Sequence, residues 1–333
     1  MSSYKFGKGG PSWNGIPMIN GVPVTFGDTA NAGAGRIFYV NPTTGSNGNK
    51  GTSMDKPVAT PAYAYSLTAS NNHDVVVLSA TSGHSAADEL AVTNNRTHFW
   101  GMDAIVRDYG YGSRSRWTMG LTTGTAIAVV KNTGVGNTFS NIKFDSSDTL
   151  STSIYSFAEG GEYTIISNCE IYKSTDLDQA TAAELLMNGD SALVTGCTIG
   201  SLANQVTAAR TNVLLTRETI SGKVARDVTF HNCLLWLNSS SATASHFHAT
   251  TATDVERMLL IEDCKMIVAK LSSGTVGDAI IVDTAQTEGQ IIVVNSCNVN
   301  STALGTTGSV GIVYYGPGIA TAGTAGNPVA VTD

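Results

Sequence analysis

All five cysteines of this 333-residue chain lie in one recurring local pattern. Mostly apolar residues stand five and three positions before each cysteine and again two positions after it, and Asn, Gly, Asp or Ser stands directly before it. The cysteines are Cys169, Cys197, Cys233, Cys264 and Cys297. Their spacing varies between 28 and 36 residues. A repeat with a constant core and variable length indicates stacked coils that are joined by loops of unequal size.

Each pattern predicts two short strands that meet at a sharp corner. Apolar residues two positions apart place one face of a strand inward, and Asn, Gly and Asp tolerate the left-handed backbone that a corner needs. A sixth copy without cysteine runs from Phe139 to Phe144, and a further strand is expected before each copy. Aligned on cysteine, the last copy directs Ile292, Val294, Cys297 and Val299 inward. The cysteines are therefore expected to form one internal ladder of free, buried thiols.

Three strands per coil and one recurrent corner predict an all-β chain, a right-handed parallel β-helix (a solenoid) of about seven coils with extended N- and C-terminal arms. A β-sandwich is the alternative, but it gives no reason for a corner motif that recurs in phase with cysteine. The expected organisation is 1–35 as an extended N-terminal arm, 36–73 as lead-in and N-terminal cap, 74–315 as the β-helix and 316–333 as a C-terminal tail.

The lead-in carries a resemblance to known proteins. It reads Phe38-Tyr39-Val40-Asn41-Pro42, then Gly45-Ser46-Asn47-Gly48-Asn49-Lys50-Gly51-Thr52, then Lys56-Pro57. This resembles the segment before the first coil in pectate-lyase-like right-handed β-helix proteins, including those of tailed-phage virions, with Asn47 where that segment often has Asp. The resemblance covers residues 36–315 and implies the fold. Because this fold carries lyases, hydrolases, adhesins and inert structural modules, it does not by itself define an activity.

Composition excludes several partners. The chain has a formal net charge of −7 and 14% charged residues, so it offers no basic surface for nucleic acid. It contains no apolar run of about 18 residues, so no membrane span is expected. The N-terminal residues lack the pattern of a signal peptide, which indicates synthesis in the host cytoplasm. No Cys/His spacing of a zinc module occurs, and no cofactor is expected.

Catalytic candidates are few. Enzymes that share the resemblance place acidic residues with Arg, Lys or His on the outer face of adjacent coils, but their N-T-D, D-D, G-H-G and R-I-K motifs do not occur here. Asp190 and Glu218 align after the first strand of successive coils, with Arg217 beside them. One coil of separation places two carboxylates about 5 Å apart, near the spacing of a retaining glycosidase pair. The alternative is that these acids are solvated or paired with a neighbouring arginine.

His246 and His248 form an H-x-H pattern on a predicted strand. Residues two apart on a strand share a face, so the two rings are candidate metal ligands. The alternative is that Phe247 points into the core and both histidines simply point outward.

Candidate partner contacts lie in the N-terminal arm and in the segment "RDYGYGSRSRW". Apolar side chains of the arm are expected to dock on a partner or on the rod, or else to close the end of the core. The basic, aromatic segment favours a protein interface or sugar stacking, with an ordinary surface loop as the alternative. The candidates are Phe6, Trp13, Ile16, Phe26, Tyr109, Tyr111 and Trp117.

These features favour a non-enzymatic structural protein of a tailed-phage virion, foremost a capsid (head) decoration protein, with a fibre or tail component as a near variant. The expected partners are further copies in a homotrimer and the major capsid protein. The alternative is a carbohydrate-active tailspike-like lyase or hydrolase that acts on a host surface glycan. A bacterial adhesin is disfavoured because it requires a secretion signal or an anchor.

Overall fold

The computed structural model describes most of the central part of the chain. The described residues are 35–79, 83–86, 89–102, 115–119, 126–147, 154–174, 182–202, 210–217, 220, 222–239, 241–269 and 277–305, with the short strands at 12–13, 16–19, 22–23 and 312–315.

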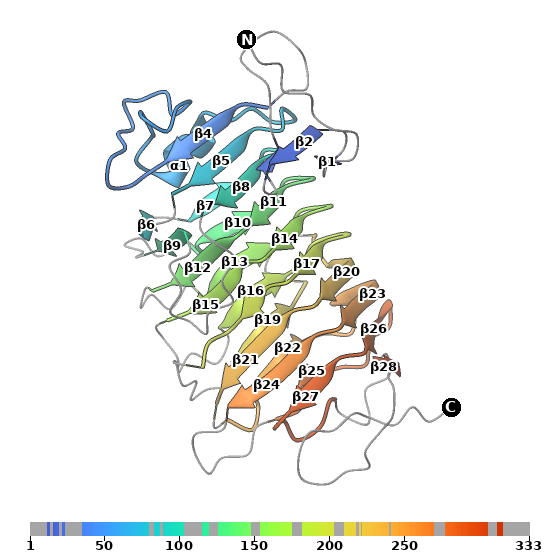
Figure 1. Ribbon diagram of the computed structural model, residues 1–333. Helices are drawn as coiled ribbons and strands as arrows, with labels where there is room; N and C mark the ends of the chain where they lie inside the picture. Colours follow the sequence, from blue (N-terminus) through green and yellow to red (C-terminus); the bar gives the residue numbers. More distant parts are fainter. Residues whose placement is uncertain are drawn as a thin grey trace.

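Three parallel sheets wind around one common core, and the strands of successive coils lie side by side along the molecule (Figure 1). The seven-stranded sheet contains β7 (Leu90–Val92), β10 (Val130–Asn132), β13 (Tyr155–Glu159), β16 (Ala183–Met187), β19 (Thr211–Leu215), β22 (Ser245–Ala249) and β25 (Ile280–Val282). The eight-stranded sheet contains β6 (Gly83–Ala86), β9 (Ser115–Met119), β12 (Ile142–Ser146), β15 (Glu170–Lys173), β18 (Thr198–Ile199), β21 (Leu234–Asn238), β24 (Lys265–Ala269) and β27 (Cys297–Val299). This arrangement confirms the predicted parallel β-helix.

The ten-stranded sheet extends beyond the other two at both ends. It contains β4 (Ile37–Val40), β5 (Val75–Leu78), β8 (His98–Gly101), β11 (Thr138–Ser140), β14 (Ile165–Ser167), β17 (Leu193–Thr195), β20 (Ala225–His231), β23 (Val255–Glu262), β26 (Gly289–Val294) and β28 (Ile312–Tyr315). A separate antiparallel sheet near the N-terminus contains β1 (Ser12–Trp13), β2 (Ile16–Ile19) and β3 (Val22–Pro23). No helix among the described residues is both long and apolar enough to cross a bilayer.

One left-handed residue makes the corner between the ten-stranded and eight-stranded sheets in six coils. These residues have φ between 48° and 63° and are Asn141, Asn168, Gly196, Asn232, Asp263 and Asn295. Left-handed backbone is costly for most L-residues, and Asn, Asp and Gly adopt it at least cost. The repeated residue type therefore sets where each coil turns, and it keeps the following strands in register.

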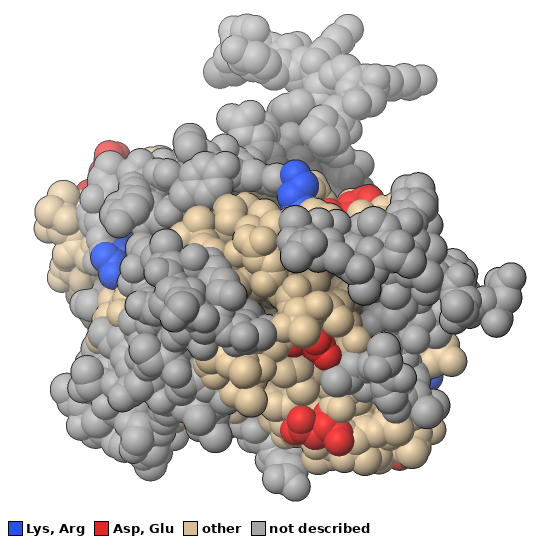
Figure 2. Space-filling model, turned by 90° about the horizontal axis from the view of Figure 1, so that it is seen from below, with Lys and Arg blue, Asp and Glu red and all other residues tan. Residues whose placement is uncertain are grey.

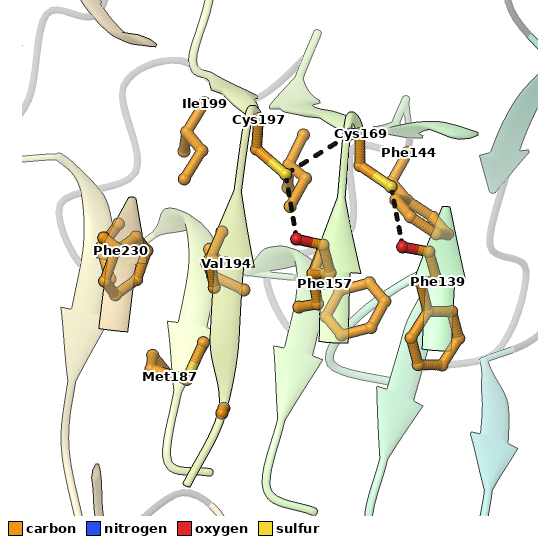
Figure 3. Packing of buried hydrophobic residues seen from close by; sticks show 14 of the residues in the cluster. Phe139, Phe144, Phe157, Cys169, Met187, Val194, Cys197, Ile199 and Phe230 are labelled. Atoms are coloured by element: carbon orange, nitrogen blue, oxygen red, sulfur yellow. Dashed lines mark hydrogen bonds between the residues drawn. The ribbon is translucent and has the colours of Figure 1, made fainter. Parts of the chain in front are cut away.

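The residue after each corner points into the core and forms the predicted ladder for four cysteines. Cys169, Cys197, Cys233 and Cys264 are buried free thiols. The thiol of Cys169 donates to the carbonyl of Phe139 at 3.5 Å, and its backbone N–H donates to Sγ of Cys197 at 3.4 Å (Figure 3). Burial raises the pKa of the Cys197 thiol well above its usual value, so this thiol stays protonated.

The expectation for Cys297 is wrong, because the last frame lies one residue earlier. Asn295 takes the left-handed corner, Ser296 takes the ladder position, and Cys297 is exposed. The hydroxyl of Ser296 replaces the thiol, since it accepts from the N–H of Cys264 at 3.0 Å and lies 3.2 Å from the carbonyl of Ile261. A slip by one residue moves every side chain of a strand to the opposite face. Val293 therefore points inward where Val294 was expected.

Trp117 is also corrected, from a partner contact to a core residue. It lies on β9, is fully buried and pairs in register with Phe144. Its ring lies 6.0 Å from that of Phe144 and 5.9 Å from that of Phe99. The strand β9 begins inside the segment that was expected to be a surface loop, and its alternation directs Trp117 inward.

The lead-in closes the first strand of the ten-stranded sheet. The backbone of Tyr39 on β4 donates to Gly51 and accepts from Val58, at 2.7 and 2.9 Å. The helix α1 (Pro61–Ser66) begins at Thr60, whose side chain accepts from the N–H of Tyr63, and it contacts β4 and β5. At Tyr39 the backbone groups on the outer edge of β4 are therefore satisfied within the chain.

The buried carboxylate of Asp74 ties this end together. It accepts hydrogen bonds from the N–H groups of Arg36 and Ala69 and from the amide of Asn72, each at 2.7 Å, and it pairs with the Arg36 guanidinium at 3.1 Å. Burial opposes ionisation of Asp74, but these bonds outweigh it and lower its pKa.

At the opposite end, which Figure 2 views from below, most described residues are neither acidic nor basic.

The thiol environments predict a simple labelling result. In native protein an aromatic disulfide reagent should react rapidly with one thiol of the five, because only Cys297 is exposed. All five should react in denaturant. Cys297→Ser should abolish the rapid native reaction, and rapid labelling that survives this substitution would show that the corrected register is wrong.

Candidate functional site

Five side chains gather on the outer face of the eight-stranded sheet, and we call them the polar cluster. They come from β9, β12 and β15 and are Arg116, Lys143, Asp145, Glu170 and Tyr172. Because Phe144 points into the core, its neighbours on the strand point outward. The parallel register then places the outward residues of the three strands side by side.

The polar cluster contains two ion pairs that share an aromatic ring. Arg116 pairs with Asp145, and Nζ of Lys143 lies 3.4 Å from Oε1 of Glu170. The ammonium of Lys143 also lies 4.8 Å from the ring centre of Tyr172, whose hydroxyl donates to Oδ2 of Asp145 at 3.2 Å. Burial and the Asp145 charge raise the pKa of Tyr172, so its hydroxyl remains a donor.

Burial determines which of these groups meets solvent. The side chain of Asp145 is 0% exposed, those of Lys143 and Glu170 are 5% and 2% exposed, and that of Arg116 is 45% exposed. The guanidinium of Arg116 is therefore the accessible part of the polar cluster. Both carboxylates of the polar cluster are paired with cations, and both are buried.

A second buried ion pair lies beside the polar cluster. Nη2 of Arg210 is 2.9 Å from Oε1 of Glu184, and both side chains are almost fully buried. The other carboxylate oxygen of Glu184 accepts the backbone N–H of Lys173. Burial raises the pKa of Glu184, while the Arg210 charge opposes that shift. Charged groups thus extend over adjacent coils where the eight-stranded sheet meets the seven-stranded one.

Of the predicted pair, Asp190 lies in the part of the chain that the structure describes, and Glu218 does not. Asp190 lies at a corner where its backbone bridges that of Arg226 in the next coil, and its carboxylate pairs with Arg226 at 3.1 Å. Arg226 also pairs with Glu256 at 2.7 Å. Arg217 is exposed and lies 3.4 Å from Glu288, and Glu218 lies outside the described residues. Asp190 is therefore one half of an ion pair, as the alternative interpretation holds.

The histidine pair is divided by burial. Phe247 is in the core, as predicted, and both histidines lie on the opposite side of β22. Both rings therefore point outward, as the alternative interpretation holds, but His246 is fully buried by neighbouring segments, and burial lowers its pKa to about 3. Nε2 of His248 lies 2.9 Å from Asp283. No three His, Cys, Asp or Glu residues in the described part of the chain are grouped to hold a metal ion.

Glu159 is a carboxyl group inside the solenoid. It is fully buried at the end of β13, where Asn132, Thr164 and the N–H of Gly161 donate to it at 2.6 to 3.0 Å. Burial raises its pKa to about 7, although these hydrogen bonds lower it in part. A carboxyl with such a pKa titrates near neutrality, but its position gives it no access to a substrate.

The remaining predicted contact residues receive no structural account. Trp13 and Ile16 lie in β1 and β2, where side chains are not described. The others fall outside the described residues and are Phe6, Phe26, Tyr109 and Tyr111.

Solved structures with a TM-score above 0.5 share the fold of this chain. A pectate lyase, Pel9A, is 12% identical with a TM-score of 0.54, over 78% of this chain and 62% of that one. A pectin methylesterase from Aspergillus niger is 12% identical with a TM-score of 0.54, over 88% and 86%. ORF18 of Geobacillus virus E2 is 11% identical with a TM-score of 0.43, over 77% and 56%. The chain therefore spans 62% of the length of the pectate lyase.

No protein-family model matches the sequence. No curated protein matches it either. At the identities of the solved structures the likeness shows the fold alone. The chain is thus a parallel β-helix protein, with an architecture that carbohydrate-active enzymes also use.

Apart from Arg116, which lies in the segment "RDYGYGSRSRW", the polar cluster lies outside the sequence-predicted sites, although the sequence contains a signal for it. In each coil the residue after the corner points inward, as Ile142 does. The cluster members on β12 and β15 stand one and three residues after that inward residue, as Lys143 and Asp145 do. These positions face outward in every coil. Charged residues there in two adjacent coils predict contact across the sheet, whereas Asp190 and Glu218 were aligned across a loop of variable length.

The polar cluster yields a stability prediction. Lys143→Met should lower the free energy of unfolding by about 3 kcal/mol, because it leaves the buried Glu170 without its cation. The double variant with Glu170→Gln should lose less than the sum of the two single variants. Urea unfolding at pH 7 measures both effects. Lys131→Met, a partly exposed position on β10, is the matched control and should change stability by less than about 0.5 kcal/mol; additive losses would contradict the proposed pairing.

Glu159 predicts a pH-dependent stability. The pKa of Glu159 is about 7 in the folded chain and 4.5 for the free side chain. Between pH 4.5 and 7 this carboxyl is therefore protonated in the folded chain and ionised in the unfolded chain. Stability should then fall as pH rises through this window, by up to about 3 kcal/mol, and stay level above it. Glu159→Gln should remove that slope in denaturant titrations at pH 5 to 8. An unchanged slope in the variant would assign the pH dependence to other groups.

Proposed function

We propose that this protein is a non-enzymatic structural component of a tailed-phage virion, foremost a capsid (head) decoration protein, with a fibre or tail component as the near variant. In this role it self-associates, with a homotrimer as the expected form, and binds the major capsid protein. This role is structural, because a solenoid with a continuous core presents regular faces to neighbouring proteins.

The observation that carries this proposal is the state of the acid and base groups on the outer faces. Both carboxylates of the polar cluster are paired and buried, and Asp190 is paired with Arg226. Such groups hold strands and coils together, whereas a general acid or a nucleophile needs access to the scissile bond. The lead-in supports the virion assignment by resemblance. Within the lead-in, the side chain of Asn47 accepts hydrogen bonds from the N–H groups of Ala59 and Thr60 at 3.0 and 3.2 Å and so stabilises this segment.

A carbohydrate-active lyase or hydrolase is the second candidate, and the polar cluster is the observation that favours it. Arg116, Asp145 and Glu170 lie on the outer face of strands in adjacent coils, the arrangement that the resemblance implies for enzymes of this fold. The similar structures named as a pectate lyase and a pectin methylesterase make an acidic polysaccharide the first substrate to test. The partly exposed guanidinium of Arg116 is suited to bind such a carboxylate.

Two measurements test these candidates. Mass spectrometry of purified phage particles should find this protein in a fixed ratio to the major capsid protein, and its absence from particles would refute the structural role. The purified protein should not shorten pectate, methylated pectin or host surface polysaccharide. Depolymerisation that Asp145→Asn abolishes, in a variant that remains folded, would establish the second candidate instead.

A further inference from the structure

Two histidine rings meet where the lead-in joins the first coils. His73 lies in the turn between α1 and β5, and His98 is the first residue of β8. Nδ1 of His73 lies 3.2 Å from Nε2 of His98. The ring planes are only 18° apart while the ring centres are 5.4 Å apart, so the two nitrogens face each other between the rings. Because a neutral imidazole nitrogen either donates or accepts, this hydrogen bond needs one proton between the two nitrogens.

The surroundings hold both rings in this contact. His98 is 4% exposed, although it lies on the opposite side of β8 from the core residue Phe99. His73 has left-handed backbone with φ of 56°, which is costly for a residue other than glycine. A Cβ at Gly35 would lie 1.8 Å from the carbonyl oxygen of His73, so the chain that enters β4 passes directly over this turn. The turn is thus enclosed between the incoming chain and the start of β8.

Three charged groups lie near the two rings. The carboxylate of Asp74, which pairs with Arg36 at 3.1 Å, favours protonation of His98 by its charge. Arg96, in the turn before β8, opposes protonation of His73. The positions in register with His98 on the neighbouring strands carry no charge and are Val75 on β5 and Thr138 on β11.

We propose that His73 and His98 form an acid-sensitive latch that holds the lead-in on the first coils. With one proton between the facing nitrogens, the two rings attract each other. When both rings are protonated, both nitrogens become donors, so the hydrogen bond is lost and two positive charges face each other close to Arg96. The turn at 69–73 then separates from β8, and the lead-in that covers the edge of β4 loosens with it.

The pKa values place this change in mild acid. Burial is the main cause that lowers the pKa of His98 from 6.5 to about 4, and burial together with Arg96 lowers the pKa of His73. A histidine whose pKa is lowered by folding contributes stability above its unfolded pKa, and that stability is lost as the pH falls toward the folded pKa. Asp74 does not supply this response, because its pKa is lowered and it stays ionised at pH 5.

Acid acts on other parts of the molecule as well, so the test has to be local. His84 and His246 are also buried with lowered pKa values, and Glu159 changes the overall stability in the opposite direction. The latch instead predicts that one turn opens before the remaining coils do. The N–H of Asn71 donates to the carbonyl of Asn95 at 2.8 Å, across the same two turns, so its exchange reports their separation. This inference goes beyond the proposed function and does not depend on it.

Hydrogen exchange at pH 7.5 and pH 5, corrected for the intrinsic effect of pH on exchange, tests the latch. In wild type the N–H of Asn71 should exchange at least about tenfold faster at pH 5, while the amides of β23 and β26 change much less. The double variant His73→Asn and His98→Gln places amide groups that do not titrate where the ring nitrogens meet, so it should lose this response. His248→Gln is the matched control, because His248 pairs with Asp283 on another sheet, and it should respond as wild type does.

Three results would overturn the latch: equal exchange of Asn71 at both pH values in wild type, an acid response that survives in the double variant, or an acid response of equal size in β23 and β26. Circular dichroism shows whether the double variant is folded. If it is not, titration of the histidine rings of wild type by NMR decides. The His98 ring should then take up its proton over the pH range in which the turn opens, and a ring that titrates near pH 6.5 without faster exchange of Asn71 would refute the latch.

Discussion

The left-handed corner residue is the constraint on which the rest of this structure depends. It turns the chain between the ten-stranded and eight-stranded sheets at the same place in coil after coil, as at Asn168, Gly196 and Asn232. Once the corner is set, alternation determines the direction of every side chain in the two adjoining strands. The buried thiols and the outward side chains of β12 and β15 in the polar cluster follow from that one choice.

The same regularity explains why charges are buried outside the core. A solenoid places like positions of adjacent coils about 4.8 Å apart, so an outward acid in one coil meets whatever its counterpart is in the next. Opposite charges are then neighbours, as Lys143 and Glu170 are, and each compensates the cost of removing the other from water. Such pairs specify coil register as well as stability, because a shift by one residue would separate them.

The fold was predictable because it depends on local rules that repeat. The corner residues and the apolar positions around them are visible in the sequence, and six coils obey them. The prediction of the strand register was wrong in the last copy, where the local rules allowed two positions for the corner. Asn295 and Ser296 could both precede an inward residue, and the run from Ile291 to Val294 is apolar throughout, so alternation could not select the phase. Asn adopts left-handed backbone more readily than Ser, which selects Asn295.

The candidate site was less predictable, because it depends on which segments cover an outer face. The pattern around His246 shows that the ring points away from the core, but only the folded chain shows that it is shielded from water. Trp117 was assigned to a loop by composition although the strand of the next coil, with Phe144 in register, makes its position internal. Contacts between coils determine both cases, and the residues that make these contacts are far apart in the sequence.

At one end of the molecule, the edge of β4 is blocked by the chain's own hydrogen bonds. Parallel strands whose backbone groups are unpaired offer a template on which another chain can add, and stacked coils would otherwise lengthen into fibres. Gly51 and Val58 already form hydrogen bonds with the backbone of Tyr39, and Asp74 accepts the N–H of Ala69 after α1, so another strand cannot pair with Tyr39 at this edge. A filament that grew by adding strands at β4 would first have to break these hydrogen bonds.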